Sequence, residues 1–308
     1  MNYRYKITGT LLAGLLFFTA CNQKKEMTAG TAVEARVMTD VAYGADPRQK
    51  MDVYLPANRT AQTPVIVFLH GGGFVAGDKN EFSAFSQQVA ARGNVVLNVN
   101  YRLVDTTGML STPPVHKASA IRIKEQLQDV DAALGFAAAR SGEWVMAPGK
   151  WNIAGHSAGA TLALLAGYTP ANAARLKAVA NLAGATDMSF ADESQFQSID
   201  PRLVELYFRA VGAEPRNANK LAYMAVSPYW VANNGSAIAT INIRPEFNVV
   251  FNMEDASKPL YQAFTQLLTS KQVKNKWVEV AGADHGFGQP GNWELVVNEM
   301  LAFFASVQ

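Results

Sequence analysis

Residues 151–160 read Trp-Asn-Ile-Ala-Gly-His-Ser-Ala-Gly-Ala. The run up to Ala154 has the composition of a short buried strand, and the small and apolar residues after the serine suit a helix. Gly155 and Gly159 allow the backbone on both sides of Ser157 to pack closely. A serine held in such a sharp strand-to-helix turn lies at the positive end of the helix dipole. The stretch predicts a nucleophilic serine, and the alternative is an idle serine in a glycine-rich turn.

Short apolar runs alternate with helical patterns along the rest of the chain. Predicted strands cover 51–55, 65–69, 95–99, 151–154, 178–182, 247–251 and 277–280. Predicted helices cover 82–92, 121–140, 158–167, 260–270 and 293–304. The run 65–69 is apolar throughout, as in a central strand that is covered on both faces. This succession predicts an α/β fold with a mostly parallel central sheet and helices on both faces.

Residues 187–227 interrupt the alternation. They contain helical patches at 201–211 and 219–226 but no predicted strand. We therefore expect a small cap insertion, at about residues 188–227, within one domain that spans 35–308. Its aromatic residues either shape a substrate pocket or form the core of the cap. They are Phe190, Phe196, Tyr207, Phe208 and Tyr223, and Tyr229 and Trp230 follow just after the insertion.

The composition excludes several classes of protein. Of the 308 residues, 49% are hydrophobic and 17% charged, which is too apolar for a disordered chain. The formal net charge of +2 lacks the strong basic excess of a nucleic-acid-binding protein. With Cys21 as the only cysteine, the chain cannot form an internal disulfide.

The N-terminal residues predict export. Arg4 and Lys6 precede an apolar run at 11–18 that has the length of a signal-peptide core and is short for a membrane span. We expect residues 1–20 to be a signal peptide and the polar residues 21–34 to be a flexible tether.

The sequence Phe18-Thr19-Ala20-Cys21 resembles a bacterial lipobox, although Phe18 stands where an aliphatic residue is usual. In a lipobox the cysteine is lipidated and becomes the new N-terminus. The resemblance implies a lipoprotein that contacts a membrane through an anchor on Cys21, in the periplasm or outer membrane of a bacterial envelope. An ordinary secretory signal with an unmodified cysteine is the alternative.

A second glycine-rich turn, His70-Gly71-Gly72-Gly73-Phe74, follows the predicted strand 65–69. Consecutive glycines allow backbone N–H groups to turn inward, where they can bind a developing oxyanion. A phosphate-binding loop is the alternative, but the lysine and the glycine spacing of such loops are missing. We expect His70 to be structural.

The chain has four histidines, and their order along the sequence selects one of them. Hydrolases with a serine in this kind of turn place the acid and then the histidine after the serine. His70 and His116 precede Ser157, and His156 adjoins it. His285, in the sequence Ala-Asp-His-Gly-Phe, is therefore the predicted general base.

The acid should follow a strand between the serine and the histidine. Asp255 lies just beyond the predicted strand 247–251 and is our choice, with Glu254 as the fallback. Asp284 adjoins the histidine that it would have to orient, and Asp187 is a less favoured alternative.

Taken together, the motifs at 70–79, 155–160 and 282–287 resemble those of α/β-hydrolase carboxylesterases. The closest likeness is to the branch of hormone-sensitive-lipase-like esterases and bifunctional feruloyl esterase/deacetylase-like proteins, and it covers about 41–304. The acid turn of that branch usually reads His-Gly-x-x-Asp, whereas residues 251–255 read Phe-Asn-Met-Glu-Asp. The resemblance implies an α/β-hydrolase fold and an oxyanion hole that the N–H groups of Gly72, Gly73 and Ala158 form.

The predicted chemistry is ester hydrolysis through an acyl-enzyme, with Ser157, His285 and Asp255 as the triad. This mechanism needs no metal and no organic cofactor. The resemblance implies a short-chain ester or an ester linked to a polysaccharide as the substrate. An arylformamidase or peptidase on the same fold and a non-catalytic binding lipoprotein are the alternatives.

Overall fold

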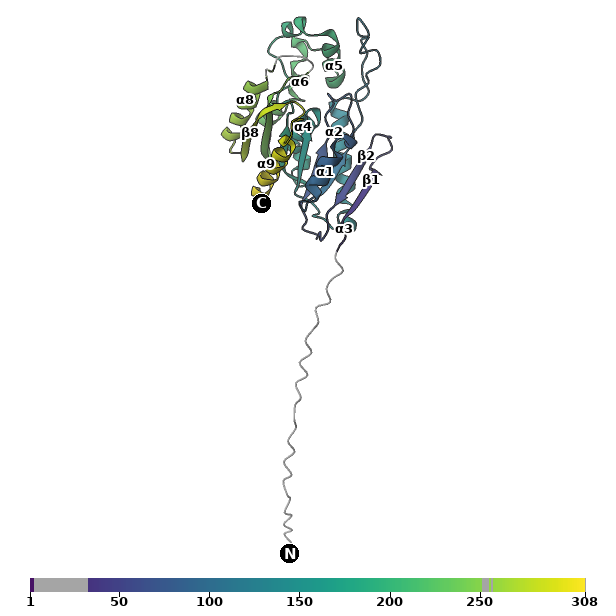
Figure 1. Cartoon of the computed structure of the whole chain (residues 1–308), viewed down its shortest axis with the longest axis vertical. Helices are drawn as coiled ribbons and strands as arrows, with labels where there is room; N and C mark the ends of the chain where they lie inside the picture. The colour runs from purple at the N-terminus through teal and green to yellow at the C-terminus, as the bar shows by residue number, and fades with distance from the viewer. Residues whose placement is uncertain (3–32, 251–254, 256, 308) are drawn as a thin grey trace. The chain divides into compact units, whose positions relative to one another are not determined.

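The strands of the computed structural model form one sheet in the order β1-β2-β4-β3-β5-β6-β7-β8 (Figure 1). The structure describes residues 1–2, 33–250, 255 and 257–307. Its strands are β1 (Arg36–Ala42), β2 (Lys50–Leu55), β3 (Val65–Leu69), β4 (Val95–Val99), β5 (Trp151–His156), β6 (Leu176–Leu182), β7 (Ala239–Phe247) and β8 (Asn275–Asp284). β2 pairs antiparallel with both β1 and β4, and all other pairs are parallel. The predicted, mostly parallel sheet is confirmed.

Helices cover both faces of the sheet, as predicted. One hydrophobic core lies between the sheet and the pair α1 (Ser83–Ala90) and α9 (Asn292–Ser306), which lie in front of it in Figure 1. The other face packs on α2 (Ile123–Ala138), α3 (Ser141–Trp144), α4 (Ala158–Tyr168), α7 (Pro228–Asn234) and α8 (Ser257–Ser270). Every residue of α4 is buried, so this helix holds the turn that precedes it firmly against the sheet.

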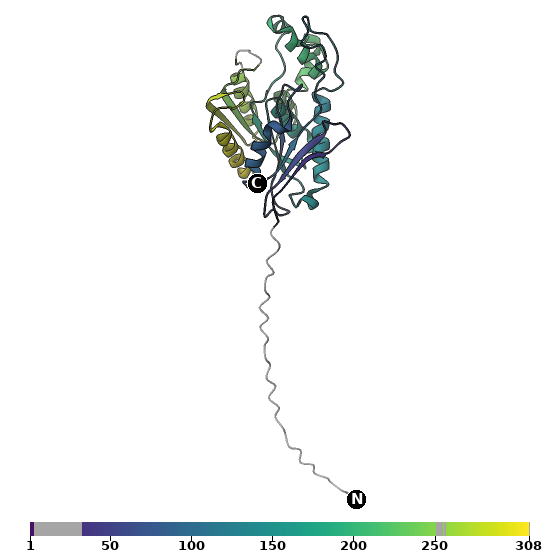
Figure 2. The same cartoon turned by 45° about the vertical axis from the view of Figure 1, so that its right-hand side comes forward.

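Between β6 and β7 the chain forms the helices α5 (Pro201–Val211) and α6 (Lys220–Met224), and within 187–227 the described residues contain no strand. Figures 1 and 2 show α5 above one end of the sheet. Asp200 caps the first turn of α5, Pro201 starts it, and Gly212 ends it at a φ of 84°. The fully buried Arg209 of α5 donates hydrogen bonds to three carbonyls of the loop 105–115, which fasten the two segments together.

Two strands differ from the prediction by more than a shift of their ends. The edge strand β1 was not predicted, because most of its residues are exposed and it contains no apolar run. The strand predicted at 247–251 is wrong, since β7 covers Ala239–Phe247. Arg244 and Pro245 are unusual in a buried strand, so the sequence pattern did not indicate one here. The Arg244 side chain is nevertheless only 2% exposed, and it forms ion pairs with Asp255 and Glu279. The carboxyl end of β7 therefore lies at Asn248, earlier than expected.

Several predicted features fall on residues that the structure does not describe. Cys21, the signal peptide after its second residue, nearly all of the tether and the alternative acid Glu254 are among them. Among the residues that it does describe, none of the helices has the length and apolar character needed to cross a membrane.

Candidate active site

Ser157 occupies the turn between β5 and α4, with a φ of 53° that only a constrained turn imposes on a serine. Glycines on both sides make this turn possible. A Cβ on Gly159 would lie 2.2 Å from the carbonyl oxygen of His70, and one on Gly155 would lie 2.4 Å from the backbone of Gly159. The strand-to-helix turn predicted from the sequence is thus present, and the serine is its strained residue.

His285 follows β8, and its Nε2 atom lies 2.9 Å from Oγ of Ser157. The structure therefore brings together the two residues that the sequence singled out. Sequence reasoning missed the role of His156, whose Nε2–H donates a hydrogen bond of 2.8 Å to the backbone carbonyl of His285. The His156 ring packs against Phe82, Phe287 and Trp293 and so fixes the loop that carries His285.

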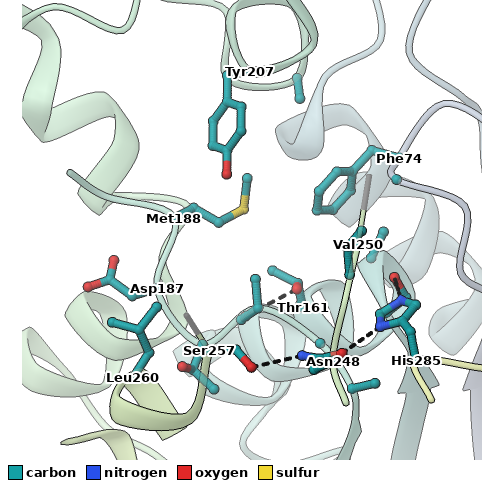
Figure 3. A pocket seen from close by; sticks show the side chains of 18 of the residues that line it. Phe74, Thr161, Asp187, Met188, Tyr207, Asn248, Val250, Ser257, Leu260 and His285 are labelled. Carbon is teal, nitrogen blue, oxygen red and sulfur yellow. Dashed lines mark hydrogen bonds between the residues drawn. The ribbon is translucent and has the colours of Figure 1, made fainter. Parts of the chain in front are cut away.

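The partner of the other ring nitrogen is an amide rather than a carboxylate. Oδ1 of Asn248, the first residue after β7, lies 2.6 Å from Nδ1 of His285 (Figure 3). Asp255 forms neither a hydrogen bond nor an ion pair with His285. The structure thus places Asn248 where the sequence analysis placed Asp255, because β7 ends before the predicted strand would.

Asp255 instead supports Asn248. Its carboxylate accepts hydrogen bonds from the backbone N–H of Asn248 at 3.1 Å, from Oγ of Ser257 at 2.6 Å and from the guanidinium of Arg244. Oγ of Ser257 also lies 3.0 Å from Nδ2 of Asn248. Figure 3 shows Ser257, Asn248 and His285 in one hydrogen-bonded line.

The surroundings of these groups shift their proton affinities in defined directions. Burial lowers the pKa of His285 to about 4; the charge of His156 acts in the same sense, and Asp284 opposes it. Burial disfavours the charge of Asp255, but hydrogen bonds from Ser257 and Asn248 and the charge of Arg244 outweigh it, so its pKa lies below the ordinary value. At neutral pH the imidazole is therefore free to accept a proton, and Asp255 is ionised.

Two of the residues that were predicted to donate backbone N–H groups to an oxyanion line the cavity beside Ser157. Ala158 begins α4, so its N–H has no partner within the helix, and Ala158 lines the same cavity as Ser157. Gly73 also lines this cavity, whereas Gly72 is not among its lining residues. Gly72 shapes the turn instead: at a φ of 112° its carbonyl accepts hydrogen bonds from the backbone N–H groups of Val75 and Ala76. Of the three predicted oxyanion donors, the structure places two at the cavity.

The histidine of this glycine-rich turn is structural, as expected. His70 is completely buried, stacks on Tyr101 at 4.4 Å and donates from Nδ1 to the carbonyl of Gly71 at 2.7 Å. Burial lowers its pKa to about 4. A neutral His70 therefore holds the shape of the turn that carries Gly73.

The cavity beside Ser157 has a volume of about 320 Å³, and the cap forms one of its walls. Apolar side chains dominate this wall and its neighbours: Phe74, Met188, Leu203, Leu206, Tyr207, Ala210 and Leu260. Of the aromatic residues predicted in or near the cap, Tyr207 alone lines the cavity. Phe190, Phe196 and Tyr223 pack on one another and on Tyr207, as a cap core would. Asp187 lines the cavity and does not contact His285.

Metal ligands are not grouped in the described part of the chain, where no cluster of three or more His, Cys, Asp or Glu side chains has suitable geometry.

Comparison with known proteins identifies the family. The BD-FAE family matches residues 51–242. The chain belongs to the BD-FAE family. The match includes Ser157 and the turn with Gly73 but ends within β7, before Asn248 and His285.

Relatives of this BD-FAE protein include esterases. Esterase LipC of Mycobacterium tuberculosis is 27% identical over 263 residues, which are 80% of this chain and 59% of LipC. A probable isoprenylcysteine alpha-carbonyl methylesterase, ICMEL1, of Arabidopsis thaliana is 28% identical over 127 residues, 41% of this chain and 24% of the relative. The chain thus spans less than two thirds of the length of these relatives.

A solved structure described as a truncated carbohydrate esterase from gut microbiota superimposes with a TM-score of 0.67 at 18% identity, over 89% of this chain and 96% of the other. This likeness, together with the sheet, confirms the predicted α/β-hydrolase fold. The chain is therefore a BD-FAE protein with the α/β-hydrolase fold, and the relatives it matches include proteins named as esterases.

Proposed function

We propose that this BD-FAE protein is a serine carboxylesterase that hydrolyses short-chain or carbohydrate-linked esters. The observation that carries the proposal is the 2.9 Å separation between Nε2 of His285 and Oγ of Ser157, in a strand-to-helix turn beside an apolar cavity. A nucleophile and a base within hydrogen-bond reach, with the base oriented by a third group, are the signature of covalent catalysis.

The reaction proceeds in two halves. Nε2 of His285 takes the proton of Ser157 as Oγ attacks the ester carbonyl, and the carbonyl oxygen becomes an oxyanion that the N–H groups of Ala158 and Gly73 can bind. Each such donor is typically worth roughly 3–4 kcal/mol of activation free energy. His285 then protonates the leaving alkoxide, which leaves an acyl-enzyme. In the second half, His285 takes a proton from water as the water oxygen attacks the acyl carbonyl. The bond to Oγ of Ser157 then breaks, His285 returns the proton to Oγ, and the acid product leaves.

Asn248 gives this site an unusual electrostatic character. Its Oδ1 can accept the Nδ1–H of His285 and orient the ring, but a neutral amide provides no negative charge to stabilise the imidazolium. The base therefore keeps a low pKa and remains unprotonated in mildly acidic solution. This supports an esterase that works from weakly acidic to alkaline pH.

The walls of the cavity support the proposed substrate class. Leu203, Leu206 and Ala210 of α5 give an apolar surface for a short acyl group. Asp187 and Tyr207 add polar atoms to the same cavity, and the Tyr207 hydroxyl has no hydrogen-bond partner among the described residues. Such groups can bind the hydroxyls of a carbohydrate.

Hydrolysis of p-nitrophenyl esters from acetate to octanoate by the full chain tests the proposal, and we expect the highest kcat/KM for short acyl chains. Leu206→Ala should move this preference toward longer chains, because the smaller side chain leaves more space in the apolar part of the cavity. The ratio of octanoate to acetate kcat/KM should rise by about tenfold or more, since each methylene in an apolar pocket is worth roughly 1–3 kcal/mol.

Leu221→Ala is the matched control, because Leu221 is 78% exposed on the cap and lies outside the cavity. It should leave the ratio unchanged. An unchanged ratio in Leu206→Ala as well would mean that the acyl group lies elsewhere. A protein with no hydrolysis above the background rate for any ester in the series would contradict the proposed activity.

We also propose that Cys21 carries a lipid anchor, which the lipobox-like sequence Phe18-Thr19-Ala20-Cys21 supports. Expression in a bacterial host should place the full chain in the membrane fraction. Cys21→Ser should move it to the soluble fraction or leave an uncleaved precursor, as immunoblots of the separated fractions would show. A processed Cys21→Ser protein that stays in the membrane fraction would count against lipidation.

A further inference from the structure

We propose that Asp255 is a positioning residue that acts on His285 indirectly. Through Ser257 it fixes the orientation of the amide of Asn248, and through Asn248 it fixes the tautomer of His285. This inference rests on the proposed serine esterase mechanism and adds a requirement to it. Three short contacts carry it: Asp255 to Ser257 at 2.6 Å, Ser257 to Asn248 at 3.0 Å and Asn248 to His285 at 2.6 Å.

The first contact decides the direction of the hydroxyl of Ser257. An ionised carboxylate only accepts hydrogen bonds, so Ser257 must donate its single hydroxyl hydrogen to Oδ1 of Asp255. Oγ of Ser257 then has no hydrogen left to donate, so its other neighbours must be donors. Nε of Arg244, at 3.3 Å, is one of them.

The second contact then decides the orientation of the amide of Asn248. Only its NH2 end can donate to Ser257, so Nδ2 faces Ser257 and Oδ1 faces His285. The reverse orientation would set a carbonyl oxygen against a hydroxyl whose hydrogen is already committed. Burial makes such an unpaired contact costly, and Asn248 is only 9% exposed.

The third contact decides the tautomer of His285. Oδ1 of Asn248 can only accept, so the proton lies on Nδ1 and the lone pair of Nε2 faces Oγ of Ser157. If the amide were reversed, its NH2 group would require the lone pair on Nδ1, and Nε2 would carry the proton. That tautomer cannot take a proton from Ser157.

A carboxylate next to His285 would not need this support, because both of its oxygens accept. An amide has one donating and one accepting end, so a neighbour must choose between them. This difference explains why the charged residue Asp255 does not touch the imidazole, from which Ser257 and Asn248 separate it in the network.

Buried partners hold Asp255 in place for this role. Arg244, only 2% exposed, binds it and also binds Glu279 at 2.6 Å, while the backbone N–H groups of Asn248 and Ser257 donate to its two oxygens. The low pKa of Asp255 means that the charge persists through the pH range in which His285 is neutral.

A double-mutant cycle tests the inference. Ser257→Ala should lower kcat by about 10- to 100-fold, the usual cost of removing a supporting hydrogen bond behind a site residue. The same change in an Asn248→Asp background should cost less than about threefold, because a carboxylate has no donating end to misplace. Ser270→Ala, at the exposed end of the same helix, is the matched control and should change neither background.

Nitrogen NMR of the full chain labelled with ¹⁵N-histidine gives a readout that does not depend on activity. The chain has four histidines, so the signals of His285 can be assigned with a His285→Gln variant. The unmodified protein should show the Nδ1–H tautomer at His285. Ser257→Ala and Asp255→Asn should each shift it toward the Nε2–H tautomer, while adding Asn248→Asp should restore Nδ1–H.

Two results would overturn the inference. One is an equal loss of kcat from Ser257→Ala in both backgrounds, which would make Ser257 a general structural support. The other is an unchanged Nδ1–H tautomer in both Ser257→Ala and Asp255→Asn. A protein with the predicted tautomer shifts but without esterase activity would instead contradict the proposed function and leave the network intact, so the two failures can be told apart.

Discussion

The Ser157→Ala variant should lose esterase activity almost completely, with kcat falling on the order of 10⁵- to 10⁶-fold for a p-nitrophenyl ester. The hydroxyl is the atom that bonds to the acyl group, and the rest of the site has no second nucleophile within reach of Nε2 of His285 among the described contacts. KM should change little, because the cavity walls and the N–H groups of Ala158 and Gly73 remain.

The fold should tolerate this change. Alanine has to adopt the same φ of 53° as Ser157, so the strain of the turn is similar in both proteins, and the Tm should shift by only a few degrees. A phosphonate ester should add one covalent group to the unmodified protein, on the peptide that contains residue 157, and none to the variant. Hydrolysis by the variant at the original rate, or labelling of another residue, would remove Ser157 as the nucleophile.

Much of the fold could be predicted from the sequence because the central strands are short runs in which apolar residues predominate. β3 and β4 have their predicted bounds, since each of their residues is buried and each run ends at a polar residue or a turn. α5 also has its predicted bounds, because Pro201 and Gly212 mark its ends. The proximity of Ser157 and His285 could be predicted from the strand-to-helix turn and the order of the motifs.

The carboxyl end of β7 could not be predicted in the same way. Its apolar and polar residues alternate from Thr240 to Ile243, which is a strand signal, but Arg244 and Pro245 then read as a break. The ion pairs that make Arg244 compatible with burial come from distant segments, which local patterns do not show. Because the end of a strand decides which side chain reaches the histidine, this local error moved the predicted partner from Asn248 to Asp255.

A search for titratable residues also could not return an amide. Asn248 has no charge and belongs to no motif, so its role emerges only from its 2.6 Å contact with His285. His156 lies in the motif around Ser157, but its role likewise emerges only from its contact with the carbonyl of His285, which joins residues far apart in the sequence. Asp255 was found as a residue of the site, but the sequence could not show that it lies behind Asn248.

Asn248 is the residue whose replacement tests this geometry most directly. Asn248→Leu should lower kcat/KM by about 10³- to 10⁴-fold at neutral pH, the size of loss seen when the catalytic histidine of a serine hydrolase is held in the wrong tautomer. Leucine has a similar size but no acceptor, so Nδ1 of His285 would lose its only side-chain partner in the described structure.

Asn248→Asp separates orientation from charge. The carboxylate should accept the Nδ1–H bond as the amide does, so kcat/KM in alkaline solution should stay within about tenfold of the original value. Its negative charge should also stabilise the imidazolium and raise the pKa of His285, by roughly 1–3 units for a charge at this distance.

Profiles of kcat/KM against pH would show this shift, because they report the ionisation of the free enzyme. Activity requires neutral His285, so the rate must fall as the pH falls through the pKa of that group. In the unmodified protein this fall should occur near pH 4, where burial and His156 place the pKa, and in Asn248→Asp it should occur at higher pH.

The two profiles also decide between Asn248 and Asp255 as the partner of His285. If Asp255 orients the base directly, Asn248→Leu should keep most of its activity. Asn248→Asp should then leave the acid limb, the fall of kcat/KM at low pH, near its original pH. If Asn248 is the partner, the leucine variant loses activity at every pH and the aspartate variant moves the limb. Only an acceptor in contact with Nδ1 can produce both effects, because orientation depends on the hydrogen bond and the pKa depends on the charge beside the ring.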